Sequence, residues 1–504
     1  MSAPSSYRQI LRSSSIIGGA SVINILIGLI RNKAAAMLLG PTGIGLIGIL
    51  QSLIATASTA SSLGLNSSAT RQIAEAATQT DNKAMASVRR ALFLATLGLA
   101  TTGAFIFWLL RDILAKQVLN DVSLTSTVGW LAVGVALTVA SGSQAALLNG
   151  LRRIGDIARI SVLSALLSTA IGVGALLIWG KAGILGYILA APIASFLLHH
   201  HYVSTLPVLA QPSTALPQLI EQMRTMTRLG LSIMFAGLVV IVGQLIVRSM
   251  VQRELGPEAL GYFQAAWTIS MTYIGFVLQA MGTDYYPRLT AVIHDKIITN
   301  RMVNEQTEVA LLLSGPILLA MLGSAPWIID LLYSNQFSEA ETVLRWHVIG
   351  DILKIVSWPL GFILLASGDG KAFLLTELLG ITVFATLTWI GLPLLGINAT
   401  GIAFLGMYIA YLSVMFQLTR RRTGFRWNTN ISQQLITLLV FASLVFTASY
   451  WSKFAGLALS ICGSTIFGIY SVKRLTNMVS PNGRLGHLTT IMQRGTEIFG
   501  PKRN

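Results

Sequence analysis

Apolar runs of about 20 residues follow one another almost without interruption from Ser13 to Val472. An α-helix of that length crosses a hydrocarbon core about 30 Å thick. The composition agrees, because 53% of the residues are hydrophobic and only 11% are charged, against roughly 25% charged in soluble domains. The sequence therefore predicts an all-α, polytopic membrane protein.

Clusters of turn residues and charges divide the apolar sequence into fourteen predicted transmembrane helices. Their predicted ranges are 14–38, 43–65, 91–110, 128–148, 160–179, 183–203, 229–251, 259–282, 309–333, 343–366, 372–392, 397–418, 434–451 and 455–472.

Lysines and arginines indicate the orientation of these helices. With a cytoplasmic N-terminus, 25 of them fall in cytoplasmic segments and 5 in periplasmic loops. This asymmetry follows the positive-inside rule, so we expect both termini in the cytoplasm. The net charge of +16 is then mainly a topology signal, and we expect no nucleic acid as a partner.

The two halves of the chain resemble each other. Residues 39–47 align with residues 255–263 at an offset of 216, and Gly155 aligns with Gly370 and Gly186 with Gly401 at 215. Repeats of six helices enter the membrane from the same side, which predicts two parallel lobes. We expect an N-lobe at 1–203, a cytoplasmic linker at 204–228, a C-lobe at 229–420, and two extra helices with a basic tail at 421–504.

The predicted helix 343–366 carries four ionisable residues, Arg345, His347, Asp351 and Lys354. Each intramembrane charge costs about 2.5–3.5 kcal/mol even on lenient insertion scales, so such residues usually face a bundle interior or a wet pathway. Spacings of three and four place His347, Asp351 and Lys354 on one helix face. That face is a candidate site of substrate contact.

The first helix carries a second polar stripe, in which Asn24 and Arg31 lie seven residues apart, with Lys33 nearby. Gln244 and Arg248 repeat this arrangement in the seventh helix. These cations either line a cavity or extend toward the membrane surface. We favour the cavity for both arginines and leave Lys33 evenly divided.

Two further acids are ambiguous. Glu377 either faces the cavity or pairs with Lys371, and Asp284 lies in an Asp-Tyr-Tyr-Pro-Arg segment that also suits an ordinary helix exit. The run His199–His201 is more easily explained at the membrane interface than as a metal site, because consecutive residues point to different helix faces.

Other chemistry finds little support in the sequence. Residues 43–48 match G-x-G-x-x-G, but they open a membrane helix, where small residues allow close packing. No nucleotide-binding loop occurs, and Cys462 is the single cysteine, which excludes an intramolecular disulfide or a cysteine-based metal site. We expect no catalytic residue, no metal and no cofactor.

Three motifs carry a resemblance to a known family. They are the G-P-x-G-x-G segment at Gly40, the W-x-x-x-G-D-x-x-K segment at Trp346, and Glu377 in the eleventh helix. Together they resemble the polysaccharide transporter (Wzx-type) branch of the multidrug/oligosaccharidyl-lipid/polysaccharide (MOP) superfamily, and are most similar to the lipid III flippases of enterobacterial common antigen synthesis. The likeness covers roughly residues 14–420 and is densest over residues 332–411.

The resemblance implies a V-shaped, two-lobed bundle in the bacterial inner membrane that moves undecaprenyl-pyrophosphate-linked oligosaccharide, such as O-antigen or common-antigen units, between leaflets. It also implies a polysaccharide polymerase and a chain-length regulator as partners, beside membrane lipids. Lys33, Asp351, Lys354 and Glu377 match polar positions of the family, and the segment at Asp284 resembles one in O-antigen and capsule translocases. Where the most similar relatives have an acid early in the eighth helix, this chain has Met271, which puts any ion-coupling role of that acid in doubt.

The sequence thus predicts a flippase in which Arg31, Lys33, Arg248 and Lys354 bind the pyrophosphate, since charged donors form strong hydrogen bonds to phosphate oxygens. Asn24 and Gln244 add polar contacts, while Asp351, Asp284 and Glu377 are candidate coupling or cavity acids. One alternative is a cation-coupled multidrug exporter on the same fold. Another is a membrane scaffold, which would leave the buried charges without a purpose.

Overall fold

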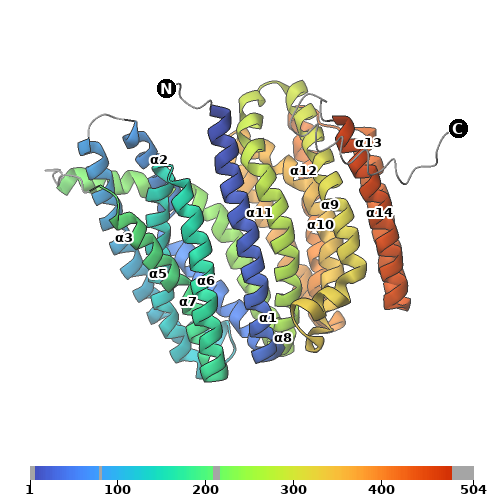
Figure 1. Ribbon diagram of the computed structural model, residues 1–504, viewed down its shortest axis with the longest axis horizontal. Coiled ribbons are helices and arrows are strands. Elements are labelled where there is room, and N and C mark those ends of the chain that lie inside the picture. Colours follow the sequence, from blue (N-terminus) through green and yellow to red (C-terminus); the bar gives the residue numbers. More distant parts are fainter. Residues whose placement is uncertain (1–5, 79–81, 208–215, 479–504) are drawn as a thin grey trace. The chain divides into compact units, whose positions relative to one another are not determined.

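The computed structural model describes residues 6–78, 82–207 and 216–478, and within these ranges every regular element is a helix (Figure 1). The α-helices are α1 Ser6–Ser62, α2 Leu65–Ala77, α3 Asn82–Leu109, α4 Arg111–Gln117, α5 Thr125–Gly150, α6 Ile154–Trp179, α7 Ile184–Ser204, α8 Leu216–Val292, α9 Lys296–Leu332, α10 Ala340–Ala366, α11 Gly370–Leu395, α12 Asn398–Thr423, α13 Thr429–Trp451 and α14 Lys453–Met478. Short 3₁₀ helices are η1 Val122–Leu124, η2 Gly180–Gly183 and η3 Asn335–Phe337.

The predicted class, an all-α polytopic membrane protein, is confirmed. Among the described residues, ten helical stretches are long and apolar enough to cross a membrane. Two of these, Ile16–Ser62 with 47 residues and Ile154–Ser204 with 51, each have the length of two crossings. The predicted helices 229–251 and 259–282 lie in α8, which is not among the ten. A total of fourteen spans stays a prediction.

The internal repeat is visible in the backbone. Three pairs of residues with positive φ, between 55° and 86°, are each separated by 216 positions: Gly40 and Gly256, Arg152 and Gly368, and Gly180 and Gly396. The helices α6 and α11 also begin 216 residues apart and contain 26 residues each. The offset of 215 that paired Gly155 with Gly370 in the sequence is therefore one residue short in this region.

The first repeated segment explains why glycine and proline occur there twice. Gly40 and Gly256 interrupt α1 and α8 with non-helical backbone, at φ 64° and 86°, values that glycine adopts without strain. An ideal Cβ on Gly45 would lie 2.5 Å from the carbonyl oxygen of Pro257, and one on Gly261 would collide with the carbonyl of Pro41. The contact is reciprocal, so these two copies pack on each other with approximate two-fold symmetry.

The chain divides into two compact units. Unit 1 comprises Met1–Ala265, Leu331–Ser338 and Glu377–Ala399, and unit 2 comprises Ala266–Asp330, Glu339–Thr376 and Thr400–Asn504. The predicted boundaries of the N-lobe, the linker and the C-lobe stay predictions. Of the predicted linker, residues 208–215 lie outside the described part of the chain, and α8 begins at Leu216.

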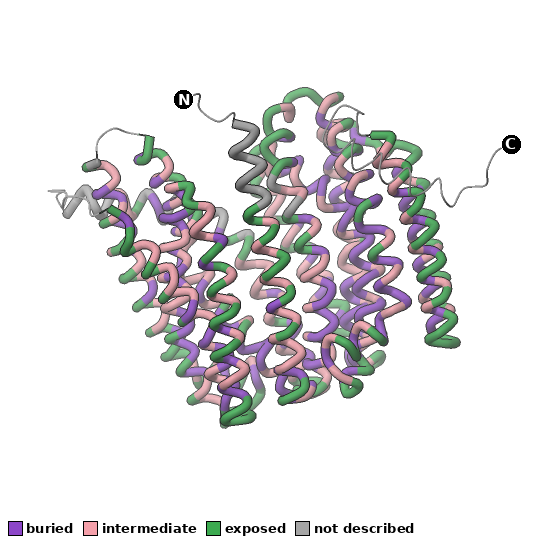
Figure 2. Tube along the Cα trace, in the orientation of Figure 1, coloured by how far each residue is buried: buried purple, intermediate pink, exposed green. Residues whose placement is uncertain are grey.

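In unit 2 the core follows α9 and α10. In their most apolar windows, 67% and 72% of the residues are buried, against 28% in α14 (Figure 2). The exposed apolar side chains of α14, such as Ile461 and Ile466, suit contact with lipid.

The last two helices, predicted as an appendage, are joined to α9 by specific contacts. The hydroxyl of Ser460 on α14 donates to the carbonyl of Leu319 at 2.7 Å, and that of Ser464 donates to the carbonyl of Pro316 at 2.7 Å. Glu308 on α9, which is 7% exposed, accepts hydrogen bonds from Arg474 at 2.9 Å and Gln434 at 3.3 Å. No local pattern in the sequence indicates this pairing, because its partners lie more than 120 residues apart.

Candidate functional site

The charged face of α10 packs against α8 within unit 2. The ring of His347 meets that of Trp267 edge to face, with centroids 5.8 Å apart. One turn further, Asp351 Oδ2 accepts a hydrogen bond from the Ser270 hydroxyl at 2.6 Å. His347, Asp351 and Lys354 therefore share a face, as predicted, and their contacts on α8 follow one another in the same order, so the two helices run parallel here.

This face is filled with protein atoms. Both His347 and Asp351 are 0% exposed, and the ring of Phe404 from α12 lies 4.7 Å from that of His347. Lys354, three residues from Asp351, is half-buried and interacts electrostatically with it. Since removing one partner of a buried charge pair leaves the other uncompensated, the first role of this cluster is to hold α10 on α8.

Lys354 is the most accessible ionisable residue of this cluster. Its Nζ lies 3.1 Å from the sulfur of Met271 and 5.8 Å from the ring centroid of Tyr408. A thioether is a weak acceptor, so this contact holds the cation less firmly than a carboxylate would.

Arg31 in α1 points into unit 1. One guanidinium nitrogen donates to the carbonyl of Tyr187 on α7 at 2.8 Å, another to the hydroxyl of Ser168 on α6 at 3.4 Å, and the guanidinium carbon lies 4.3 Å from the centroid of the Tyr187 ring. About two turns earlier in α1, the side-chain amide of Asn24 donates a hydrogen bond to the hydroxyl of Ser161, 2.5 Å away. The predicted polar stripe thus faces α6 and α7 instead of lipid.

Lys33 lies two residues beyond Arg31 and is half-buried. Two residues correspond to a rotation of about 200° around a helix, so Lys33 and Arg31 point to nearly opposite sides of α1. The two cations therefore do not form one pair of donors for the same ligand.

Arg248 in α8 is 5% exposed. Its Nε donates to Gln264 at 3.0 Å and one terminal nitrogen donates to the carbonyl of Gln244 at 3.3 Å. The side chain of Gln264 in turn fills the space left by the missing Cβ of Gly48, its counterpart at the offset of 216. Arg248 is thus built into the close contact between the two repeated segments.

The two arginine stripes are not equivalent, which corrects the expectation that one repeats the other. At the offset of 216 fixed by Gly40 and Gly256, Arg31 corresponds to Val247 and Arg248 to Asn32. One residue is a rotation of about 100° around a helix, so the two cations leave their helices in different directions. The resemblance in sequence came from spacing alone.

The remaining acids differ in exposure. Asp284 pairs with Arg288 at 2.9 Å on the surface, with 74% and 62% of the two side chains exposed. Exposed pairs at this spacing contribute little, about 0.3–0.5 kcal/mol. Glu377 on α11 is half-buried within unit 1. No group of three or more His, Cys, Asp or Glu able to hold a metal ion occurs among the described residues.

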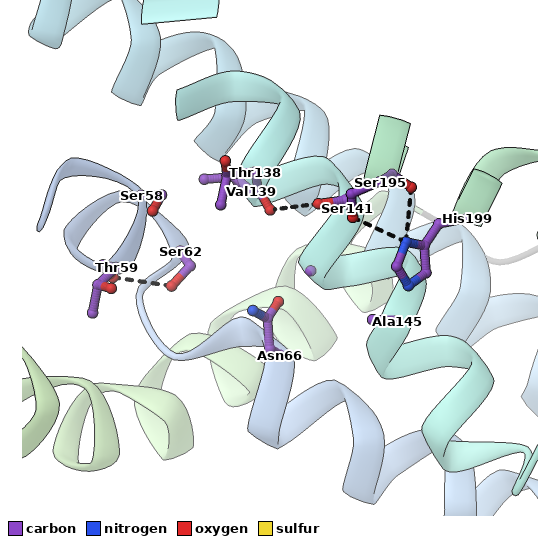
Figure 3. Close-up of a pocket in the computed structure, with 11 residues that line it drawn as sticks. Ser58, Thr59, Ser62, Asn66, Thr138, Val139, Ser141, Ala145, Ser195 and His199 are labelled. Atoms are coloured by element: carbon purple, nitrogen blue, oxygen red, sulfur yellow. Dashed lines mark hydrogen bonds between the residues drawn. The ribbon is translucent and has the colours of Figure 1, made fainter. Parts of the chain in front are cut away.

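A pocket that the sequence analysis missed lies in unit 1 between α1, α2, α5 and α7, with a volume of about 310 Å³ (Figure 3). Its lining includes Ser62 on α1, Asn66 on α2, Ser141 on α5 and His199 on α7. Of the three consecutive histidines, only His199 lines it, while His200 stacks on Phe196. In an apolar helix, the sequence does not distinguish a serine or threonine that lines a pocket from one that packs against a neighbouring helix.

Solved structures of transporters share this fold. An inward-facing multidrug resistance MATE family transporter of the MOP superfamily superposes with a TM-score of 0.68 at 16% identity, covering 82% of this chain and 98% of the other. The lipid II flippase MurJ in an inward closed conformation gives a TM-score of 0.64 at 13% identity, covering 90% and 98%. At these identities the likeness establishes the fold alone.

The sequence comparison is more specific. The model of a family described as "Polysaccharide biosynthesis protein" matches residues 35–342, and the chain belongs to that family. It is similar to the lipid III flippases of Escherichia coli (strain K12) and Shigella flexneri, each 23% identical over 427 residues, which covers 82% of this chain and 99% of the relative.

Proposed function

We propose that this protein is a flippase for a lipid-linked oligosaccharide. The observation that carries the proposal is that the chain, a member of the polysaccharide biosynthesis family, is similar to a lipid III flippase over 99% of that protein's length. The fold of a second lipid-linked precursor flippase, MurJ, supports it. The substrate is an undecaprenyl-pyrophosphate-linked repeat unit, which the protein moves from the cytoplasmic to the periplasmic leaflet by alternating access.

We assign the four predicted cations to two roles. Two of them bind the pyrophosphate, and the other two hold helices in place. Lys33 and Lys354 are half-buried and positively charged, and charged donors form strong hydrogen bonds to phosphate oxygens, which supports direct contact with the pyrophosphate. Arg31 and Arg248 hold α1 and α8 in place through their hydrogen bonds. Asn24 and Gln244 support the arginine stripes, and Asp351 and Glu377 are the proposed acids near the pathway.

The proposed location and partners of the protein follow from the same family. We propose the bacterial inner membrane, with both termini in the cytoplasm as the distribution of lysines and arginines indicates. A polysaccharide polymerase and a chain-length regulator are the proposed partners. Asp284, exposed beside Arg288, is placed where it contacts headgroups or a partner more readily than a buried substrate.

The alternative function is a cation-coupled multidrug exporter, which the MATE structures favour through the fold alone. A cavity for organic cations needs acids or aromatic faces, which attract positive charge. In the described part of the chain, the ionisable side chains at these intramembrane positions are instead cations: Arg31 and Lys33 in α1, and Arg248 in α8. This sign of charge favours an anionic headgroup.

Deletion of the gene in the native host tests the proposal. We expect the surface glycan to disappear and its undecaprenyl-linked precursor to accumulate, with unchanged susceptibility to cationic drugs. Normal glycan together with increased drug susceptibility would establish the exporter instead.

Variants returned to the deletion strain then test the cations. Lys33→Ala and Lys354→Ala, at normal protein levels, should abolish the glycan, and Lys33→Arg and Lys354→Arg should retain part of it, because the charge stays. Arg31→Ala and Arg248→Ala should also abolish it. Full glycan production in all four alanine variants would refute cation binding of the pyrophosphate.

A further inference from the structure

Most of the residues that line the pocket of unit 1 have neutral polar side chains. Eleven residues line it, of which seven are Ser, Thr or Asn and one is His199, and none is Asp, Glu, Lys or Arg (Figure 3). It lies among helices that are otherwise apolar. Its volume of about 310 Å³ falls at the lower end of the range of ligand pockets, roughly 300–1,000 Å³.

The hydroxyl groups of the pocket are oriented by their own helices. Ser58 donates to the carbonyl of Ala55 at 3.2 Å, Ser62 to Thr59 at 3.0 Å, and Ser141 to Thr138 at 3.1 Å. Each hydroxyl hydrogen is thereby used, while the oxygen keeps lone pairs that can accept. The serine and threonine wall of the pocket is therefore mainly a surface of hydrogen-bond acceptors.

Of the two larger polar side chains, His199 continues this pattern, and Asn66 adds an amide whose Nδ2, a donor, lies beside Gly142. His199 directs Nδ1 at the carbonyl of Ser195, 2.8 Å away, so Nδ1 carries the hydrogen and Nε2 is an acceptor in the neutral ring. The Oδ1 atom of Asn66 is buried and has no hydrogen-bond partner among the described residues. Asn66 follows Gly64, whose φ of 68° and close approach to Gly230 fix the turn that places the amide.

A surface of acceptors without cations selects its ligand. A pyrophosphate offers only acceptors and negative charge, so it gains nothing from these hydroxyl oxygens. A sugar offers many hydroxyl donors and no charge. A polar pocket in apolar surroundings gains most from a ligand that satisfies its acceptors.

We propose that this pocket binds a neutral sugar unit of the oligosaccharide, away from the cations that bind the pyrophosphate. The inference rests on the proposed function and deepens it, because it assigns the glycan its own binding site in unit 1. The acceptors of Ser62 and Ser141 receive sugar hydroxyls, and the missing Cβ of Gly142 leaves room for the Asn66 amide beside them.

The single cysteine provides the test. In a Cys462→Ser background of the full chain in nanodiscs, Ser141→Cys places a thiol in the pocket and Ser204→Cys places one at the exposed end of α7. Three probes are added before maleimide labelling: the precursor that accumulates in the deletion strain, its oligosaccharide released by mild acid, and undecaprenyl pyrophosphate. At ten times its dissociation constant, a bound probe slows labelling about tenfold.

We expect the precursor and the released oligosaccharide to protect Cys at position 141, and none of the probes to protect position 204. Protection by undecaprenyl pyrophosphate equal to that by the precursor, or no protection by either sugar-bearing probe, would overturn the proposal. Should the deletion strain keep its glycan and accumulate no precursor, the proposed function fails, while oligosaccharides prepared from the surface glycan still test the pocket.

A matched pair of glycine variants gives a second measurement. A Cβ on Gly142 would lie 2.6 Å from Asn66 Nδ2 and displace that amide into the pocket, whereas a Cβ on Gly98 in α3 would meet no atom within 4 Å. Gly142→Ala should lose both protection by the released oligosaccharide and glycan production, and Gly98→Ala should retain them. Equal behaviour of the two variants contradicts the proposal.

Discussion

Two polar regions inside the membrane-spanning helices are built in opposite ways. Around Asp351, charged groups lie in a closely packed contact between α10 and α8. Around Asn66 and Ser141, neutral groups surround open space. The difference teaches that the buried charge of Asp351 marks a contact that fixes two helices, while the pocket is lined mainly by uncharged polar side chains, which cost less to leave exposed in a membrane-spanning bundle.

The largest effect should come from breaking the charged region. Asp351→Ala removes the partner of Ser270 and leaves Lys354 without its nearby acid, which should cost about 3–5 kcal/mol of stability. Thermal unfolding in detergent measures the loss. Adding Lys354→Met should restore much of it, and a double variant no more stable than Asp351→Ala would show that the pair is not coupled.

A smaller loss is expected at Arg31. Arg31→Met removes the charged donor to the carbonyl of Tyr187 and to Ser168, and hydrogen bonds of charged groups contribute about 1.5–3 kcal/mol each. The matched variant Lys33→Met, on the other side of α1, should change the unfolding temperature much less. Equal losses from both would mean that Arg31 has no special structural role.

The neutral pocket should tolerate change. Ser141→Ala and Thr138→Val remove hydroxyls bonded to their own helix, so the stability should change by no more than about 1 kcal/mol, while glycan production falls. Unfolding temperature and glycan are measured on the same preparations. A strongly destabilised pair of variants would make the pocket a packing element like the charged region.

The smallest effect tests a charge outside the spans. Asp369 caps α11 through the Ala372 amide at 2.9 Å and pairs with Arg422, and both hold its carboxyl pKa below the ordinary value. The folded state then binds fewer protons than the unfolded state, so this stabilisation is present above about pH 4 and is lost as the pH falls through the lower, folded pKa.

Asp369→Asn keeps a capping oxygen and loses the ion pair. Its unfolding temperature should lie slightly below that of the wild type at pH 7, and the difference should shrink as the pH falls below about 4. A difference that persists unchanged in acid would exclude the ion pair as its cause.

Much of the fold could be predicted from the sequence, because helix length and charge asymmetry are local properties. The offset of 216 between the two Leu-Gly-Pro segments predicted the repeat that the backbone breaks at Gly40 and Gly256 display. Spacing also placed His347, Asp351 and Lys354 on one face. Spacing failed for Arg31 and Arg248, since a shift of one residue turns a side chain by about 100°.

By itself, the sequence determined that this chain must lie in a membrane as helices, since an apolar run satisfies its backbone in lipid only by coiling. Only the tertiary structure decided which polar groups meet. The pairing of Glu308 with Arg474 and the gathering of Ser62, Asn66 and Ser141 around open space join residues far apart in the chain. Such contacts depend on how whole helices pack against one another, and no local pattern in the sequence indicates that packing.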